Sequence, residues 1–304
     1  MSAAEAPPRL RTVFCTSGGL YGALVLRRLS VCRQIEICAV VRSTRVLDRR
    51  SGFVRGAWAH LRRSGIAYTL YLWWATTVTD WLCALTGACM VPMRSTRVCR
   101  VLSTRDINGP EGRRFLADSA PDLVVSAFFN QRLEATTLQA PRLGCVNVHP
   151  SLLPDAKGVD PVFQALLSRS AQLGVTVHLM SPELDAGPIL AQRSVEAPEG
   201  ASLFASTALL FREGSKLLAS AIDTVARGSA GRAQISAGDY QSWPTSQELR
   251  LWRAGGGALV RVADLLALLR GRSPCRPKPA GAIMGLKGYR ERQPISGSAQ
   301  GLSD

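Results

Sequence analysis

The amino-acid sequence predicts an α/β protein in which a mostly parallel, twisted sheet carries helices on both faces. Short, mostly apolar runs at residues 11–15, 35–41 and 123–126 have the length and β-branched content of buried strands. Longer runs of helical character, such as residues 20–29, separate them. Strands that alternate with helices build a parallel, Rossmann-like sheet. The 304 residues, 46% of them hydrophobic, suffice for its core.

The chain opens with a strand, a glycine-rich turn and a helix. Residues 11–15 are expected to form the strand, Thr16-Ser17-Gly18-Gly19 the turn, and residues 20–29 the helix. A turn of this kind offers backbone N–H groups to an anion. The run lacks the G-x-G-x-x-G spacing of dinucleotide sites, so a plain strand-to-helix turn is the alternative.

An apolar helical insertion at about residues 51–92 follows the second strand, which is expected at residues 35–41. From residue 66 to residue 91 the one charged side chain is Asp80, and tyrosine and tryptophan are frequent. Three interpretations are open: a helical insertion in a soluble protein, peripheral contact with a membrane through residues 66–91, and a membrane span. A charge near the middle of the segment counts against a span.

The remaining elements continue the alternation. The sequence predicts strands at 98–102, 123–126, 145–149, 175–179 and 189–195, and helices at 110–118, 160–167 and 202–227. Residues 1–230 would form the core domain, with a short extension at 231–270 that packs on it. Residues 271–304 are rich in Gly, Pro, Ser, Arg and Lys, so we expect a disordered tail.

The stretch from Gly144 to Leu190 holds the candidate catalytic residues Asn147, His149 and Asp185. Asn147 and His149 lie on one face at the end of a strand, and Asp185 follows the next strand in a turn. The histidine and the amide can donate to an oxyanion, while the carboxylate orients the ring and relays a proton. These roles suit acyl transfer to an amine. His178, in mid-strand, is expected to be a structural or supporting group.

The amino-acid sequence of this stretch resembles that of the folate-dependent formyltransferase family, which includes methionyl-tRNA, glycinamide ribonucleotide and aminosugar formyltransferases. The resemblance covers Asn-x-His-Pro-Ser-Leu-Leu-Pro from residue 147, Lys157-Gly158, the Gly-Val-Thr-Val-His run from residue 174 and Asp-x-Gly-Pro-Ile-Leu from residue 185. It implies the family's N-terminal catalytic domain and 10-formyltetrahydrofolate as the formyl donor. It also implies Asn147, His149 and Asp185 as the catalytic residues.

The resemblance further implies two sets of binding residues. The donor would contact Phe129, Asn130, Gln131, Arg132, Leu184 and Gly187. The acceptor would contact Ser17, Gly18, Ser151, Lys157 and Gly158, with a phosphate or hydroxyl group at the first two. Leu179 and the Ser181-Pro182 pair depart from the family's usual residues, and they could alter the pocket on the folate side without removing the chemistry.

The net charge of +15 favours an anionic acceptor, either a small molecule or tRNA that carries the amine. The eight cysteines have no metal-ligand spacing, so no metal site is expected. A cytoplasmic location is the default, with peripheral attachment at the inner face of the membrane as an addition. Two alternatives to formyl transfer are hydrolysis of 10-formyltetrahydrofolate and a catalytically silent, membrane-associated binding protein.

Overall fold

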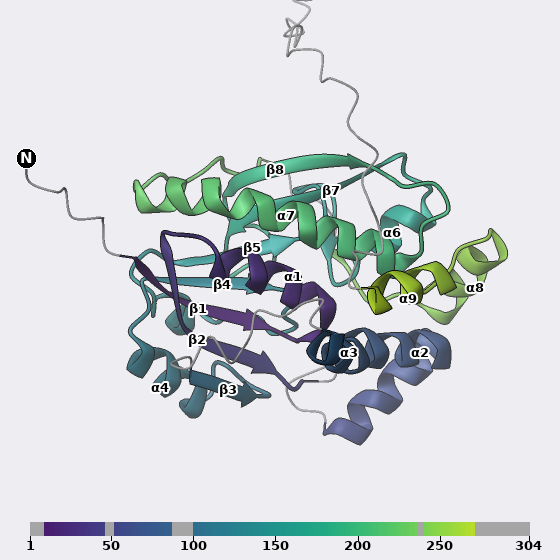
Figure 1. The fold of residues 1–304 in the computed structure, drawn as a ribbon, viewed down its shortest axis with the longest axis horizontal. Coiled ribbons are helices and arrows are strands. Elements are labelled where there is room, and N and C mark those ends of the chain that lie inside the picture. Colours follow the sequence, from purple (N-terminus) through teal and green to yellow (C-terminus); the bar gives the residue numbers. More distant parts are fainter. Residues whose placement is uncertain (1–8, 46–51, 87–99, 236–239, 271–304) are drawn as a thin grey trace, which may run out of the picture.

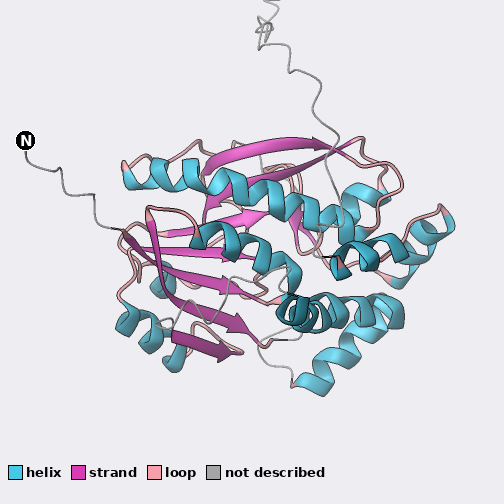
Figure 2. Ribbon diagram, viewed as in Figure 1, coloured by secondary structure: helices cyan, strands magenta, loops and turns pink. Residues whose placement is uncertain are grey.

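Seven strands form one twisted sheet in the order β3-β2-β1-β4-β5-β7-β8 (Figures 1 and 2). The computed structural model describes residues 9–45, 52–86, 100–235 and 240–270. The strands are β1 (Leu10–Thr16), β2 (Ile35–Ser43), β3 (Arg100–Thr104), β4 (Leu123–Ala127), β5 (Cys145–His149), β7 (Gln172–Leu179) and β8 (Ile189–Glu196). The first five run parallel, whereas β7 is antiparallel to both β5 and β8. The predicted mostly parallel α/β sheet is confirmed.

Helices cover both faces of this sheet. The helices α1 (Gly19–Ser30) and α7 (Leu203–Ala226) pack on one face, and α4 (Pro110–Ser119) and the short α5 (Ala135–Leu138) lie on the other. Because successive side chains of a strand point to opposite faces, Phe14 of β1 joins the core under α1 and α7. Its neighbours Val13 and Cys15 join the core under α4. The parallel strands are therefore apolar on both sides, as their sequences predict.

The insertion after β2 is helical over its described residues. It consists of α2 (Phe53–Trp73), a π-helical turn η1 (Trp74–Val78) and α3 (Thr79–Thr86), and α2 is kinked at Gly65, whose φ is 77°. These helices lie beyond the carboxyl ends of β1 and β2 (Figure 1). Among the described helices, none combines the length and apolarity needed to cross a membrane. Residues 87–92 of the expected insertion, and residues 98–99 of the expected third strand, lie outside the described residues.

The chain after α7 returns to the core at several places. Arg232 pairs with Ile189 at the start of β8, and β9 (Tyr240–Gln241) pairs in parallel with β6 (Lys157–Gly158). The helices α8 (Ser246–Ala254) and α9 (Val262–Leu269) follow, while α6 (Pro161–Leu167) precedes β7. The expected tail, residues 271–304, lies outside the described residues.

Candidate active site

The structure places Asn147 and His149 on the same face of β5, at the carboxyl end of this strand. Both lie where β5 runs between β4 and β7, and His149 is 5% exposed. The strand ends there because Pro150 has no N–H to continue the ladder. The two polar side chains therefore reach the edge of the sheet where α/β proteins bind ligands.

Asp185 comes to the same place from the loop between β7 and β8. Its Oδ1 lies 3.5 Å from Nδ1 of His149, and its Oδ2 accepts a hydrogen bond of 3.3 Å from the N–H of Gly158. The side chains of His149 and Asp185 are 7% and 13% exposed, so water screens this contact weakly. Asp185 has a φ of 53°, in the left-handed region that aspartate tolerates better than most residues. The strands β5 and β6 thus meet the loop of Asp185 at its carboxylate.

His178 holds Asn147 and borders Asp185. Its Nδ1 donates to the carbonyl oxygen of Leu179 at 2.7 Å, which leaves Nε2 of the neutral ring to accept from the amide of Asn147 at 3.2 Å. Burial first, and then the nearby His149, lower the pKa of His178 to about 4 against the opposing charge of Asp185. The ring is therefore neutral near pH 7, and it fixes the orientation of the Asn147 amide.

The loop before β6 closes the other side of His149. Nε2 of His149 lies 3.3 Å from the carbonyl oxygen of Ala156, which also accepts from Oγ of Ser151 at 2.6 Å. Ser151 is 4% exposed and helps to shape the loop, while its contact with the acceptor stays a prediction. Lys157 is 8% exposed in β6, and the amide of Gly158 is the one that contacts Asp185.

The glycine-rich turn after β1 does not present free N–H groups. Each of the four amides from residue 17 to residue 20 is bonded within the chain. Their acceptors are the carbonyl oxygen of Phe128, Oγ1 of Thr16, Oδ1 of Asp80 and Oγ1 of Thr79, in that order. Asp80 also pairs with Arg42. The insertion's own carboxylate and hydroxyl thus bond to the amides of Gly19 and Leu20 at the helix N-terminus, and the contact of Ser17 and Gly18 with the acceptor stays a prediction.

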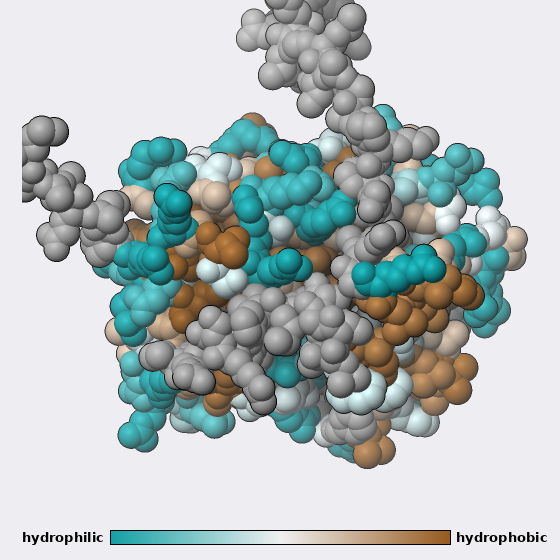
Figure 3. Space-filling model, viewed as in Figure 1, coloured by the Kyte–Doolittle hydropathy of each residue, from teal (hydrophilic) through white to brown (hydrophobic). Residues whose placement is uncertain are grey.

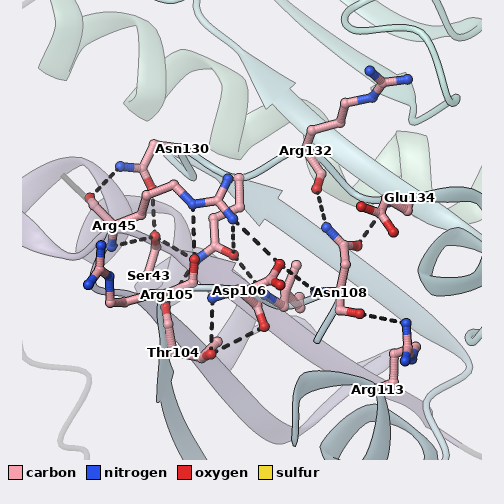
Figure 4. A network of polar contacts seen from close by, with 12 residues as sticks. Ser43, Arg45, Thr104, Arg105, Asp106, Asn108, Arg113, Asn130, Arg132 and Glu134 are labelled. Carbon is pink, nitrogen blue, oxygen red and sulfur yellow. Dashed lines mark hydrogen bonds and ion pairs between the residues drawn. The ribbon is translucent and has the colours of Figure 1, made fainter. Parts of the chain in front are cut away.

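Asn130 ties three loops together beside this turn (Figure 4). Its Oδ1 accepts hydrogen bonds from the hydroxyl groups of Ser17 and Ser43, and its Nδ2 donates to the carbonyl oxygen of Arg45 at 2.8 Å. The amide side chain joins the ends of β1, β2 and β4. Its polar side-chain atoms bond within the chain, and its contact with the donor stays a prediction.

Gln131 is a second internal connector, and it is 4% exposed. Its Nε2 donates to Ser43 and to the carbonyl oxygen of Thr104, while its Oε1 accepts from the amide of Ile107 at 2.8 Å. The contact of this side chain with the donor stays a prediction. The next residue, Arg132, is exposed, and its carbonyl oxygen accepts from Asn108 (Figure 4).

The other expected donor contacts lie in different surroundings. Phe129 is partly buried and packs against the core under α4. Leu184, next to Asp185, is 43% exposed and offers an apolar surface beside the carboxylate. Gly187 is buried, and a Cβ there would lie 1.9 Å from the carbonyl oxygen of Leu179, so this position needs glycine for a close approach of the two backbones.

Two residues that the sequence did not single out also reach the site. Nε2 of Gln234 donates to the carbonyl oxygens of Asp185 and Gly187, at 3.0 and 2.6 Å, and so holds the loop between β7 and β8. Burial, and secondarily the charge of Asp185, raise the pKa of Tyr240. Both residues belong to the segment after α7, and no local motif marked them. Among the described residues, no cluster of His, Cys, Asp and Glu could hold a metal ion.

Residues 95–222 match the family model described as Formyl transferase. The methionyl-tRNA formyltransferase of Roseiflexus castenholzii is 40% identical over 129 residues, which are 42% of this chain and 41% of that protein. The methionyl-tRNA formyltransferase of Thermotoga maritima is 39% identical over 94 residues, 31% of this chain and 30% of that protein. The chain thus matches less than half the length of these curated relatives.

Two solved structures share the fold. Glycinamide ribonucleotide transformylase 1 from Symbiobacterium toebii has a TM-score of 0.52 at 18% identity, over 77% of this chain and 98% of that chain. A sugar N-formyltransferase from a Shewanella species has a TM-score of 0.51 at 16% identity, over 77% of this chain and 76% of that chain. At these identities the likeness concerns the arrangement of the sheet and its helices.

Proposed function

We propose that this chain, in which residues 95–222 belong to the formyl transferase family, moves a formyl group from 10-formyltetrahydrofolate to a primary amine. The observation that carries the proposal is the distance of 3.5 Å between the His149 ring and the Asp185 carboxylate, beside the Asn147 amide. These groups come from β5 and from the loop after β7, and they meet at the carboxyl edge of the sheet.

The proposed reaction needs no nucleophile from the protein. The lone pair of the amine attacks the formyl carbon, a C–N bond forms, and the carbonyl oxygen becomes an oxyanion. Asn147 donates one N–H to His178 and can give the other to the oxyanion. The Nε2–H of His149, which also faces the carbonyl oxygen of Ala156 at 3.3 Å, would be shared with the oxyanion. Asp185 accepts the proton that the amine loses. As the oxyanion collapses to a carbonyl, the bond from the formyl carbon to the folate nitrogen breaks and that nitrogen takes the proton from Asp185.

The structure offers more candidate contacts for the folate donor than for the acceptor. Leu184 is exposed beside the carboxylate and suits the aromatic body of the folate donor, with Phe129 and Arg132 as further candidates. The acceptor is a small molecule or a tRNA that carries an amine, and the charge of +15 favours an anionic one. Ser17 and Gly18 are further candidates for the acceptor, and because Asp80 bonds to the next amide, they suit a hydroxyl group of the acceptor better than a phosphate.

The test incubates the purified full chain with 10-formyltetrahydrofolate and a panel of amines. The release of tetrahydrofolate measures the rate of formyl transfer. Asp185→Asn and His149→Ala should each lower kcat by about 10²- to 10⁴-fold, because each removes a proton-transfer or oxyanion group. Asp155→Asn is the matched control, since this carboxylate is exposed in the loop before β6. Near-normal turnover by Asp185→Asn would contradict the mechanism.

The same assay separates the alternatives. Release of formate without any amine would indicate hydrolysis instead of transfer. Failure to bind a reduced folate saturably would favour a catalytically silent protein. Both outcomes would count against the proposed reaction, whatever the behaviour of the variants.

A further inference from the structure

The insertion turns an apolar stripe outward. Ile66, Leu70, Trp73 and Trp81 are spaced as neighbours on one side of the continuous helix from α2 to α3, and they are 66%, 55%, 54% and 63% exposed. A helix on the surface of a globular protein normally places polar residues on its outer side. The stripe reverses that pattern over several turns.

The opposite, inner side of the same helix packs against the rest of the protein. Tyr68 and Tyr71 are 0% and 7% exposed, and the Tyr68 hydroxyl donates to Asp160 at 2.6 Å. Ser64 donates to the carbonyl oxygen of Pro244 at 2.6 Å. The insertion is therefore held on the protein by its inner side, and the outward stripe is a surface in its own right.

Neighbouring helices enlarge this surface. Before the kink, Val54, Trp58 and Leu61 continue along α2, and they are 79%, 58% and 40% exposed. On α9, which contacts α3, exposed apolar side chains are Val262, Leu265, Leu266 and Leu269. Figure 3 shows apolar groups gathered over α9 and along α2 on one side of the molecule. We call the exposed apolar residues of α2, α3 and α9 the apolar face. Contiguous apolar areas of this kind mark contact sites.

The charges around the apolar face are mainly positive. Arginines on and beside these helices are Arg55, Arg62, Arg63, Arg250, Arg253, Arg261 and Arg270. The carboxylates nearby bond to other groups of the chain: Asp80 to Arg42, Glu248 in the capping box of α8, and Asp264 to Ser202. Tryptophan and arginine together are typical of helices that lie in the interface of an anionic bilayer.

We propose that the apolar face docks on the surface of an anionic phospholipid bilayer. Exposed tryptophans at positions 58, 73 and 81 would enter the headgroup region, and the arginines would contact lipid phosphates. A second copy of the chain fits less well, because a two-fold contact brings the same arginine-rich rim against itself. This inference goes beyond formyl transfer, and its test needs no catalytic turnover.

The test measures co-sedimentation of the full chain with vesicles of phosphatidylcholine alone and of phosphatidylcholine mixed with phosphatidylglycerol. Ile66→Gln with Leu70→Gln removes two members of the stripe at exposed positions, so folding should persist, as circular dichroism can verify. The matched control is Val31→Gln with Val101→Gln, two exposed apolar residues outside the apolar face, 67% and 45% exposed. Bromine-labelled lipid chains report whether tryptophan enters the bilayer.

We expect binding to anionic vesicles at least tenfold stronger than to neutral ones, weakening as salt is added. The Ile66 and Leu70 double variant should bind at least tenfold more weakly, while the control binds like the parent chain. Failure to sediment with either vesicle would overturn the proposal, as would equal binding by both double variants. A dimer in lipid-free solution that the Ile66 and Leu70 substitutions dissociate would show a second copy as the occupant, and would also overturn it.

Discussion

Gly158→Ala is expected to damage both the fold and the site through one contact. Gly158 has a φ of 141°, which side chains with a Cβ rarely adopt, and an added Cβ would lie 2.1 Å from the carbonyl oxygen of Gln241. That oxygen accepts from the amide of Val159 at 3.1 Å, so β6 and β9 cannot stay paired as they are. The amide of Gly158 would also move away from Asp185.

The loss of stability in Gly158→Ala is the sum of the strained φ angle and the lost hydrogen bond. The unfavourable φ costs about 1–3 kcal/mol, and loss of the hydrogen bond at Gln241 about 1 kcal/mol. We therefore expect the free energy of unfolding to fall by about 2–4 kcal/mol. Gly228→Ala separates backbone strain from the contact with Gln241. Gly228 also has a positive φ, of 75°, but nothing lies within 4 Å of an added Cβ. That control should lose only about 1 kcal/mol.

Urea denaturation of the two variants and the parent chain measures both changes. Formyl transfer, if the proposed function holds, should fall in Gly158→Ala and stay near the parent value in Gly228→Ala. Equal stability of the two variants would refute the reasoning, since it would mean that the contact with Gln241 yields without cost.

Two further predictions concern other buried polar groups. Thr79→Val should destabilise the protein by about 1–3 kcal/mol in thermal or urea unfolding, because it leaves a buried amide of α1 without an acceptor. The exposed Thr77→Val is its control, and an equal loss there would contradict the capping role. The pKa of His178 is about 4 in the folded protein and 6.5 in a model peptide, so the unfolded chain binds the extra proton between these values. Stability should therefore be complete above pH 6.5 and fall toward pH 4, with a shallower slope in His178→Gln.

Much of the fold is readable from short stretches. The strand at residues 145–149 is observed with the predicted bounds, and the long helix predicted at 202–227 is observed as Leu203–Ala226. Residues 11–15 and 35–41 lie within β1 and β2, because buried parallel strands need apolar side chains on both faces. The placement of Asn147 and His149 on one face followed from the two-residue period of a strand.

The binding residues were harder to predict because their partners lie far along the chain. Gln131 looked available in the sequence, yet it bonds to Ser43 and Thr104 and is buried. Ser17 and Gly18 had the local pattern of an anion site, but the pattern does not tell what packs against it. Gln234 stands in a segment without periodicity or motif, although it holds the loop of Asp185.

The sequence by itself determined the alternation of strands and helices and the three polar residues at one sheet edge, because periodicity and short motifs are local properties of the chain. Only the tertiary structure decided which polar groups already have hydrogen-bond partners within the chain. Asp80 reaches an amide 61 residues earlier, and Thr79 reaches one 59 residues earlier, so the insertion caps the N-terminus of α1. Such contacts depend on how separate segments pack, and a hydrogen-bonding group taken by one partner is no longer free for another.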